Sequence, residues 1–246
     1  MFNIAIQAEN LTKRYSLQRQ RTFKEFLPAL FGGQDTHVKF KALSHLDFIL
    51  EKGESLGILG KNGSGKSTLL KIIAGVTKPS DGRITVNGRV APLIELGAGF
   101  HPELTGRENV YLNGSILGIK HKEMEMLYPE IVKFAELEEF MDQPIKHYSS
   151  GMYMRLAFAV AVAETPDILL VDEILAVGDQ KYQKKCLTRM TEFKKNGSTM
   201  IMVSHNPEQV KKYCNKGLVL HQGKQLFFGE IEKATAVYEE MMDRAS

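Results

Sequence analysis

The sequence predicts an α/β protein built on a mostly parallel sheet, and two features of the chain support this. Short apolar stretches that favour strands, at residues 55–59, 168–171, 199–203 and 217–220, alternate with helical patterns. The 246 residues are within reach of one large domain. Strands that alternate with helices normally form a parallel sheet whose ligands bind at the carboxyl ends of the strands. We therefore expect functional residues just after these strands.

The segment after the first of these strands reads GKNGSGKS at residues 60–67 and fits the pattern G-x-x-x-x-G-K-[ST]. Its glycines let backbone N–H groups wrap phosphate oxygens ahead of a helix N-terminus. In this pattern Lys66 supplies a charge for the β- and γ-phosphates, and the Ser67 hydroxyl is a ligand for Mg²⁺. A chance glycine-rich turn is the alternative, and the flanking strand and helix argue against it. The expected ATP-binding residues here are Gly60, Lys61, Asn62, Gly63, Ser64, Gly65, Lys66, Ser67 and Thr68.

An acidic pair, Asp172 and Glu173, follows the apolar strand 168–171. A carboxylate in that place can hold a hard cation such as Mg²⁺, if necessary through a water molecule. The alternative is an exposed pair of acids without a ligand, which the phosphate loop earlier in the chain makes improbable. Asp172 is therefore a second expected metal ligand beside Ser67.

A second motif reads YSSGM at residues 148–152, with Arg155 three residues later. It resembles the signature loop of the ABC ATPases, LSGGQ, which is also followed by an arginine. The resemblance covers essentially the whole chain and implies one ABC-type nucleotide-binding domain over residues 1–246. It implies a P-loop NTPase with a RecA-like, mostly parallel core, an antiparallel β subdomain and an inserted helical subdomain at about residues 104–164. Within that helical block, Pro129 is expected to be a first helical residue.

The resemblance also assigns roles to single residues and implies ATPase activity. Glu173 would polarise the attacking water, and His205, which follows an apolar strand, would sense the γ-phosphate. Asp179 would couple two sites across a dimer, and Tyr15 would stack on adenine. The signature residues, by resemblance, contact the γ-phosphate held by an opposing subunit, so a homodimer is expected; they are Ser149, Ser150, Gly151 and Met152.

Three departures from the family pattern narrow the resemblance. The signature is YSSGM, Glu95 stands where a metal-contacting glutamine is usual, and about 25 extra residues occupy positions 16–40. Together with GAGFHPELTGREN at residues 97–109, they make the chain similar to the ATPases that export bacterial surface polysaccharides, above all O-antigen. That subfamily implies ATP and Mg²⁺, a polytopic transmembrane permease, a lipid-linked polysaccharide as cargo and a peripheral place on the cytoplasmic face of the inner membrane. We expect no C-terminal carbohydrate-binding domain.

The extra N-terminal segment carries an apolar stripe at helical spacing: Phe23, Phe26, Leu27, Leu30 and Phe31. Pro28 interrupts this pattern, because proline lacks the N–H of one helical bond. The net charge of the chain is +3, yet residues 11–41 alone carry +5. Either this is a solvated basic loop packed on the protein itself, or it lies near an anionic membrane face and the permease.

Other classes of protein explain the sequence less well. No stretch approaches the roughly 20 apolar residues that cross a bilayer. A capsule or teichoic acid exporter is the nearest alternative. A soluble ABC ATPase acting on nucleic acid or ribosomes usually has tandem domains or coiled-coil insertions, so we expect no nucleic acid partner. A P-loop kinase of a small metabolite would leave the signature and His205 unexplained.

Overall fold

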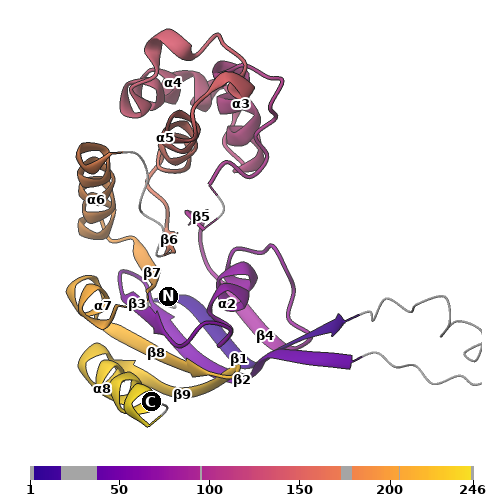
Figure 1. The fold of residues 1–246 in the computed structure, drawn as a ribbon, viewed down its shortest axis with the longest axis vertical. Coiled ribbons are helices and arrows are strands. Elements are labelled where there is room, and N and C mark those ends of the chain that lie inside the picture. The colour runs from indigo at the N-terminus through magenta and orange to yellow at the C-terminus, as the bar shows by residue number, and fades with distance from the viewer. Residues whose placement is uncertain (1–2, 18–37, 95, 173–178, 205, 245–246) are drawn as a thin grey trace, which may run out of the picture.

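The structure is a computed structural model that describes residues 3–17, 38–94, 96–172, 179–204 and 206–244 (Figure 1). Its strands are β1 (Ile4–Leu17), β2 (Val38–Glu51), β3 (Ser55–Leu59), β4 (Asp81–Val86), β5 (Val90–Pro92), β6 (Ile168–Val171), β7 (Thr199–Val203), β8 (Lys216–His221) and β9 (Lys224–Glu230). They form one sheet in the order β4-β1-β2-β9-β8-β3-β7-β6-β5. The three apolar stretches predicted as strands in the second half of the chain are confirmed.

The sheet has a parallel part and an antiparallel part. Strands β5, β6, β7, β3 and β8 pair in parallel, and β9 closes this part antiparallel to β8. Strand β1 pairs antiparallel with β2 on one side and with β4 on the other. A single pair, Ser44 with Lys224, joins the two parts. Every residue of β3, β6 and β7 is buried, as expected of parallel strands covered on both faces. The predicted fold class is confirmed.

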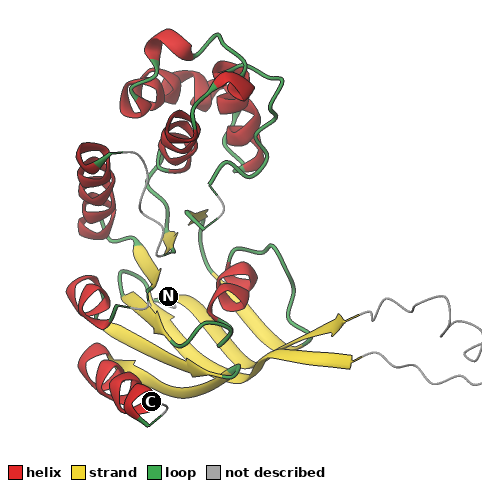
Figure 2. Ribbon diagram, viewed as in Figure 1, coloured by secondary structure: helices red, strands yellow, loops and turns green. Residues whose placement is uncertain are grey.

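Helices lie on both sides of the sheet and in a separate group beyond its end (Figure 2). They are α2 (Lys66–Ile73), α3 (Gly106–Ile116), α4 (His121–Ala135), α5 (Ser150–Ala161), α6 (Gln180–Lys195), α7 (Pro207–Tyr213) and α8 (Ile231–Asp243). The group formed by α3, α4 and α5 has its own hydrophobic cluster, which includes Val110, Ile131 and Leu156. In the part of the chain that the structure describes, no helix has the length and apolar character to cross a membrane.

The expectation that Pro129 begins a helix is wrong. Pro129 lies inside α4, which starts at His121 and continues to Ala135. A proline there removes one backbone hydrogen bond. The helix continues past it because Met124, Ile131 and Val132 are buried on one face of α4, and that tertiary packing outweighs the local preference.

Strands β1 and β2 are the longest of the sheet, with 14 residues each. They pair as far as Leu17 with Val38, so a two-stranded ribbon projects from the edge of the sheet (Figure 1). Most of the extra N-terminal segment, residues 18–37, is outside the described residues. The apolar stripe lies within it, so its role remains a prediction.

Candidate functional site

The phosphate loop joins β3 to α2, and two of its glycines are required by close contacts. A Cβ atom on Gly60 would lie 2.4 Å from both the Leu220 carbonyl oxygen and the Ser64 Oγ. Gly65, the N-cap of α2, has φ +107°, and a Cβ there would lie 2.6 Å from the Ala42 carbonyl oxygen. The loop therefore packs tightly against neighbouring backbone, as only glycine at these two positions allows. Its N–H groups can then bind an anion at the carboxyl end of β3.

A cavity of about 290 Å³ opens above this loop. Lys66 lies at its base, where the Nζ donates to the carbonyl oxygens of Gly60 (2.6 Å) and Lys61 (3.0 Å). Asp172, which follows β6, reaches the same cavity from the neighbouring part of the sheet. The lining consists of Phe40, Ala42, Asn62, Gly63, Gly65, Lys66, Ser67, Thr68, Asp172 and Val203.

This set of side chains fits a nucleoside triphosphate with Mg²⁺. Ser67 offers a hydroxyl and Asp172 a carboxylate, which are the oxygen ligands that Mg²⁺ prefers. Within the described ranges no group of three or more His, Cys, Asp or Glu residues could hold a metal ion by itself. Mg²⁺ bound beside phosphates needs no such group, because it keeps several waters and takes only one or two protein ligands.

The aromatic side chain that borders this cavity is Phe40, which sequence reasoning missed. Tyr15, predicted to stack on adenine, is the direct partner of Phe40 across the β1–β2 ribbon but does not line the cavity. Directly opposite residues of an antiparallel pair share a face, so both rings lie on the same side of the ribbon. Phe40 is 50% exposed and Tyr15 37%. The ribbon thus offers two rings, and the adenine contact of Tyr15 remains a prediction.

The signature residues line a second cavity, of about 470 Å³, at the N-termini of two helices. Ser149 is the N-cap of α5, and its Oγ accepts a hydrogen bond from the Met152 N–H (3.2 Å). Asp179 is the N-cap of α6, and its Oδ1 accepts from the Tyr182 N–H (2.8 Å). The lining residues are Ser149, Ser150, Gly151, Met152, Met154, Arg155 and Asp179. The positive end of the α5 dipole makes the site suitable for phosphate.

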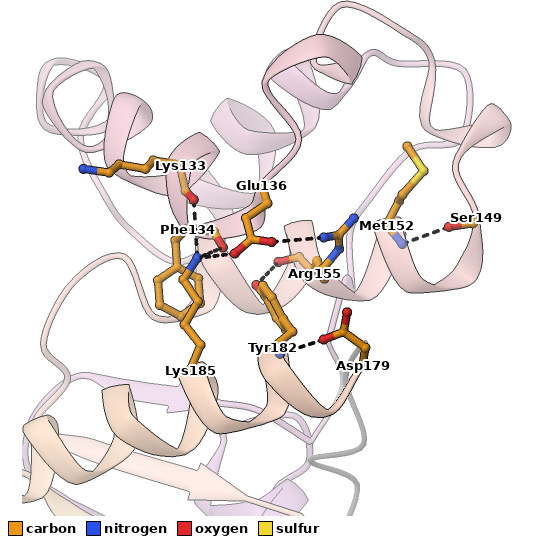
Figure 3. Close-up of polar contacts among 9 residues, drawn as sticks. All are labelled: Lys133, Phe134, Glu136, Ser149, Met152, Arg155, Asp179, Tyr182 and Lys185. Carbon is orange, nitrogen blue, oxygen red and sulfur yellow. Dashed lines mark hydrogen bonds and ion pairs between the residues drawn. The ribbon is translucent and has the colours of Figure 1, made fainter.

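Side chains from three helices fix the position of this second cavity (Figure 3). Glu136 follows α4 in a left-handed conformation (φ +57°). Its carboxylate accepts a hydrogen bond from Lys185 Nζ (3.0 Å) and lies 3.6 Å from the Arg155 guanidinium. Lys185 also donates to the Phe134 carbonyl oxygen (2.9 Å) at the end of α4. The hydrogen bond from Lys185 lowers the pKa of Glu136 below its ordinary value.

A further contact in this network runs from α6 back to the signature helix. The Tyr182 hydroxyl donates to the Arg155 carbonyl oxygen (3.1 Å). The backbone N–H of the same residue donates to Asp179, the N-cap of α6. Glu136 and Arg155 lie far in the sequence from Tyr182 and Lys185, which share α6, and no motif relates the four residues. Sequence reasoning missed this network, because no local signal relates residues on different helices.

The two cavities share no lining residue. The predicted phosphate and metal residues are brought together in the first, except for Gly60, Lys61 and Ser64, which form the loop itself. The predicted signature residues and Asp179 are brought together in the second. Glu95, Glu173 and His205 lie outside the described residues, so their roles remain predictions.

Comparison with known proteins gives a consistent picture. Residues 43–176 match the family model described as ABC transporter. The chain is 46% identical over 204 residues to the O-antigen export system ATP-binding protein RfbB of Klebsiella pneumoniae, covering 83% of both chains. It is 42% identical over 242 residues to the teichoic acids export ATP-binding protein TagH of Bacillus anthracis, covering 98% of this chain and 44% of that one.

Solved structures support the fold. A dimeric structure of a post-hydrolysis state of the ATP-binding cassette MJ0796, bound to ADP and Pi, superposes with a TM-score of 0.70. The superposition covers 92% of this chain and 98% of that one at 23% sequence identity. An ATP-binding subunit of an ABC transporter superposes with a TM-score of 0.74, also at 23% identity. At this level of identity the likeness concerns the fold.

Proposed function

Because the chain belongs to the ABC transporter family of ATPases, we propose that it is the ATP-hydrolysing subunit of an exporter of a lipid-linked surface polysaccharide of the O-antigen type. The observation that carries this proposal is the 46% identity to an O-antigen export ATP-binding protein over 83% of both chains. A teichoic acid exporter is the alternative, supported by the 42% identity to TagH over 98% of this chain. In either case the chain works as a peripheral subunit on the cytoplasmic face of the membrane.

In this proposal two copies of the chain form the working ATPase. One chain offers one phosphate loop and one signature, and these line different cavities. A nucleotide held by Lys66 of one copy would meet Ser149 and Gly151 of its partner. The signature then contributes a hydroxyl, a backbone N–H and the positive end of a helix dipole. Phosphoryl transfer to water depends mainly on positioning and charge neutralisation, so closing the two copies together would start hydrolysis.

Within each copy the residues have separate tasks. Lys66 and the N–H groups of the phosphate loop bind the phosphates, and Ser67, Asp172 and Glu95 hold Mg²⁺, which neutralises phosphate charge when bound. Glu173 orients the attacking water, and His205 contacts the γ-phosphate. The two aromatic rings of the ribbon, Phe40 and Tyr15, cover the adenine.

The proposed permease binds an apolar groove on the side of the molecule between the sheet and the helical group. The groove has a volume of about 180 Å³, and its lining includes Val76 (57% exposed) and Ile116 (59% exposed). Its other lining residues are Pro92, Ile94, Leu96, Gly97, Ala98, Asn113, Leu117, Ala157 and Ala161. A short cytosolic helix of the permease would bury this surface, and the neighbouring Glu95 would connect it to the nucleotide.

A reconstitution with the permease tests the proposal. The chain and its permease in lipid vesicles should move a lipid-linked polysaccharide only with ATP, and Glu173→Gln should stop both transport and hydrolysis while ATP still binds. The double substitution Val76→Ser, Ile116→Ser should reduce assembly with the permease and leave basal hydrolysis intact. Met126→Ser, at a residue 74% exposed on α4, is the matched control. A host that keeps its surface polysaccharide after loss of this chain would overturn the proposal.

A further inference from the structure

The loop 97–100 is held to the helical group by side chains from two different helices. The Tyr153 hydroxyl of α5 donates a hydrogen bond to the Gly97 carbonyl oxygen (3.0 Å). The Asn113 side-chain amide of α3 donates to the next carbonyl, that of Ala98 (2.7 Å). The Gly97 carbonyl also accepts from the Phe100 N–H (2.9 Å), which closes the turn. Two successive carbonyl groups of the loop are thus attached to α5 and α3.

The fit around Tyr153 is close. Gly97 has φ +78°, and a Cβ atom on it would lie 2.4 Å from the Tyr153 hydroxyl oxygen. The Phe100 ring packs edge-on against the Tyr153 ring, with centroids 5.4 Å apart and an interplanar angle of 72°. Backbone and ring leave no space for a side chain between them, so a shift of either one must move the other.

Tyr153 also contacts the signature loop directly. Its backbone N–H donates to the carbonyl oxygen of Ser149 (2.9 Å), one helical turn earlier. Tyr153 therefore contacts Ser149 through its backbone N–H and the loop 97–100 through its side-chain hydroxyl. Burial raises the pKa of Tyr153, so the hydroxyl keeps its proton and remains a donor near neutral pH.

From these contacts we propose that Tyr153 is a positioning residue for ATP hydrolysis: its hydroxyl fixes the Gly97 carbonyl to the signature helix, so that the loop 97–100 moves together with Ser149. When the signature of one copy closes on the nucleotide of another, the loop 97–100 of the first copy moves with its signature. That loop begins two residues after Glu95. The loop also forms part of the apolar groove, since Gly97 and Ala98 line it. The inference rests on the proposed closure of two copies, but it does not depend on which substance is exported.

The test compares Tyr153→Phe with Tyr111→Phe in the full chain. Both substitutions remove one hydroxyl from the helical group and keep the ring. The Tyr111 ring stacks on Tyr128, and its hydroxyl makes no hydrogen bond to the described residues. For Tyr153→Phe we expect kcat to fall about three- to tenfold, as the loss of one neutral hydrogen bond allows, with KM for ATP within about twofold of the wild type.

Hydrogen exchange of the backbone amides supplies a second measurement. In Tyr153→Phe the amides of residues 97–100 should exchange faster, and their response to a non-hydrolysable ATP analogue should shrink. Tyr111→Phe should leave both unchanged. Equal kcat values in the two variants, or unchanged exchange at 97–100 in Tyr153→Phe, would overturn the proposal.

A double variant shows whether Tyr153 acts through the signature. Ser149→Ala and Tyr153→Phe should reduce kcat less in combination than the product of their separate effects, because both weaken the same step. If the fold-reduction in kcat of the double variant equals the product of the two single reductions, the residues act independently and the proposal is contradicted. All of these measurements use the chain without its permease, so a failure to reconstitute polysaccharide export would leave their outcome unaffected.

Discussion

The phosphate loop and the signature region both prepare a surface for phosphate, but they are held in place by different means. At Gly60 and Gly65 a Cβ atom would meet neighbouring backbone at 2.4 and 2.6 Å, so the phosphate loop has almost no freedom to move against the sheet. At Gly151 of the signature the nearest atom to a Cβ would be the Ser149 Oγ, at 3.9 Å. The signature loop is open, and its location depends on side-chain contacts from other helices.

These contacts are partly exposed. The Glu136 side chain is 42% exposed and that of Lys185 34%, so their ion pair is screened by solvent and is weak. A fixed phosphate loop and an adjustable signature suit a reaction in which the nucleotide binds to one copy first and the second copy completes the site. The comparison teaches that backbone packing holds the phosphate loop, whereas solvent-exposed side-chain contacts position the signature loop.

The largest effect is expected at the fixed half. Gly65→Ala should abolish ATP binding, because the new methyl group would lie 2.6 Å from the Ala42 carbonyl oxygen at a residue with φ +107°. Gly118→Ala is the control, since Gly118 has φ +80° and no atom within 4 Å of a Cβ. That control should cost only about 1–2 kcal/mol of backbone strain and keep ATP affinity. Nucleotide titrations measure both, and ATP binding by Gly65→Ala would contradict the fixed-loop account.

At the adjustable half we expect loss of rate without loss of binding. Ser149→Ala removes the hydroxyl that would contact the γ-phosphate in the proposed dimer, and it should lower kcat by about 10²-fold, with KM for ATP nearly unchanged. It also removes a helix N-cap, which costs roughly 1 kcal/mol of stability.

Thr105→Ala separates these two consequences. Thr105 caps α3 through a capping box with Glu108, away from both cavities. Its replacement should cost similar stability and leave kcat unchanged. If both variants lose the same rate in steady-state assays, the Ser149 effect is only structural.

The aromatic ribbon provides a smaller and more local contrast. Phe40→Ala should raise KM for ATP about fivefold or more, because stacking on a base contributes roughly 1–3 kcal/mol. Tyr15→Ala should have a smaller effect, since Tyr15 lies beside the cavity rather than in it. Steady-state titrations with ATP and GTP measure both. A larger effect for Tyr15 would restore the assignment made from the sequence.

The smallest effect is expected at the Glu136–Lys185 contact. Glu136→Gln should lower the free energy of unfolding at neutral pH by less than about 1 kcal/mol, because the pair is exposed to solvent. The folded pKa of Glu136 lies below the ordinary value of 4.5. Its stabilising contribution is therefore complete above that value and is lost as the pH falls through the folded pKa.

Urea unfolding at several pH values checks this expectation. The difference between the wild type and Glu136→Gln should shrink as the solution is acidified below pH 4.5. Glu138→Gln, at an exposed glutamate in the short 3-10 helix that follows Glu136, is the control and should unfold like the wild type. A difference that grows on acidification would contradict the assigned contact.

The parts that sequence predicts well are those with short, stereochemically demanding motifs. The glycines of the phosphate loop and the apolar run before Asp172 specify their own conformation, so the phosphate-binding part of the first cavity follows from the sequence. The signature loop is recognisable because YSSGM followed by Arg155 resembles the family signature, and the structure adds that Ser149 caps α5. The parallel character of the sheet also follows, because strands that are buried on both faces read as continuous apolar runs.

The parts that sequence does not predict depend on contacts between distant residues. Phe40 was missed because its place at the cavity follows from the β1–β2 register, which pairs it with Tyr15. Pro129 was assigned wrongly because tertiary packing of α4 outweighs a local preference. The hydrogen bond from Tyr153 to Gly97 joins residues 56 positions apart, and no motif relates them.

Mixing two inactive variants tests the central claim, that each ATP site combines the phosphate loop of one copy with the signature of another. Lys66→Ala removes the phosphate-binding lysine, and Ser149→Ala removes the signature hydroxyl. Each variant alone should be nearly inactive. If the sites are shared, a pair made of one copy of each variant has one site with both defects and one intact site. Mixing should therefore restore hydrolysis to the level of one active site per mixed pair. A mixture that remains as inactive as its two components, although mixed pairs form, would show that the signature acts on the nucleotide of its own chain.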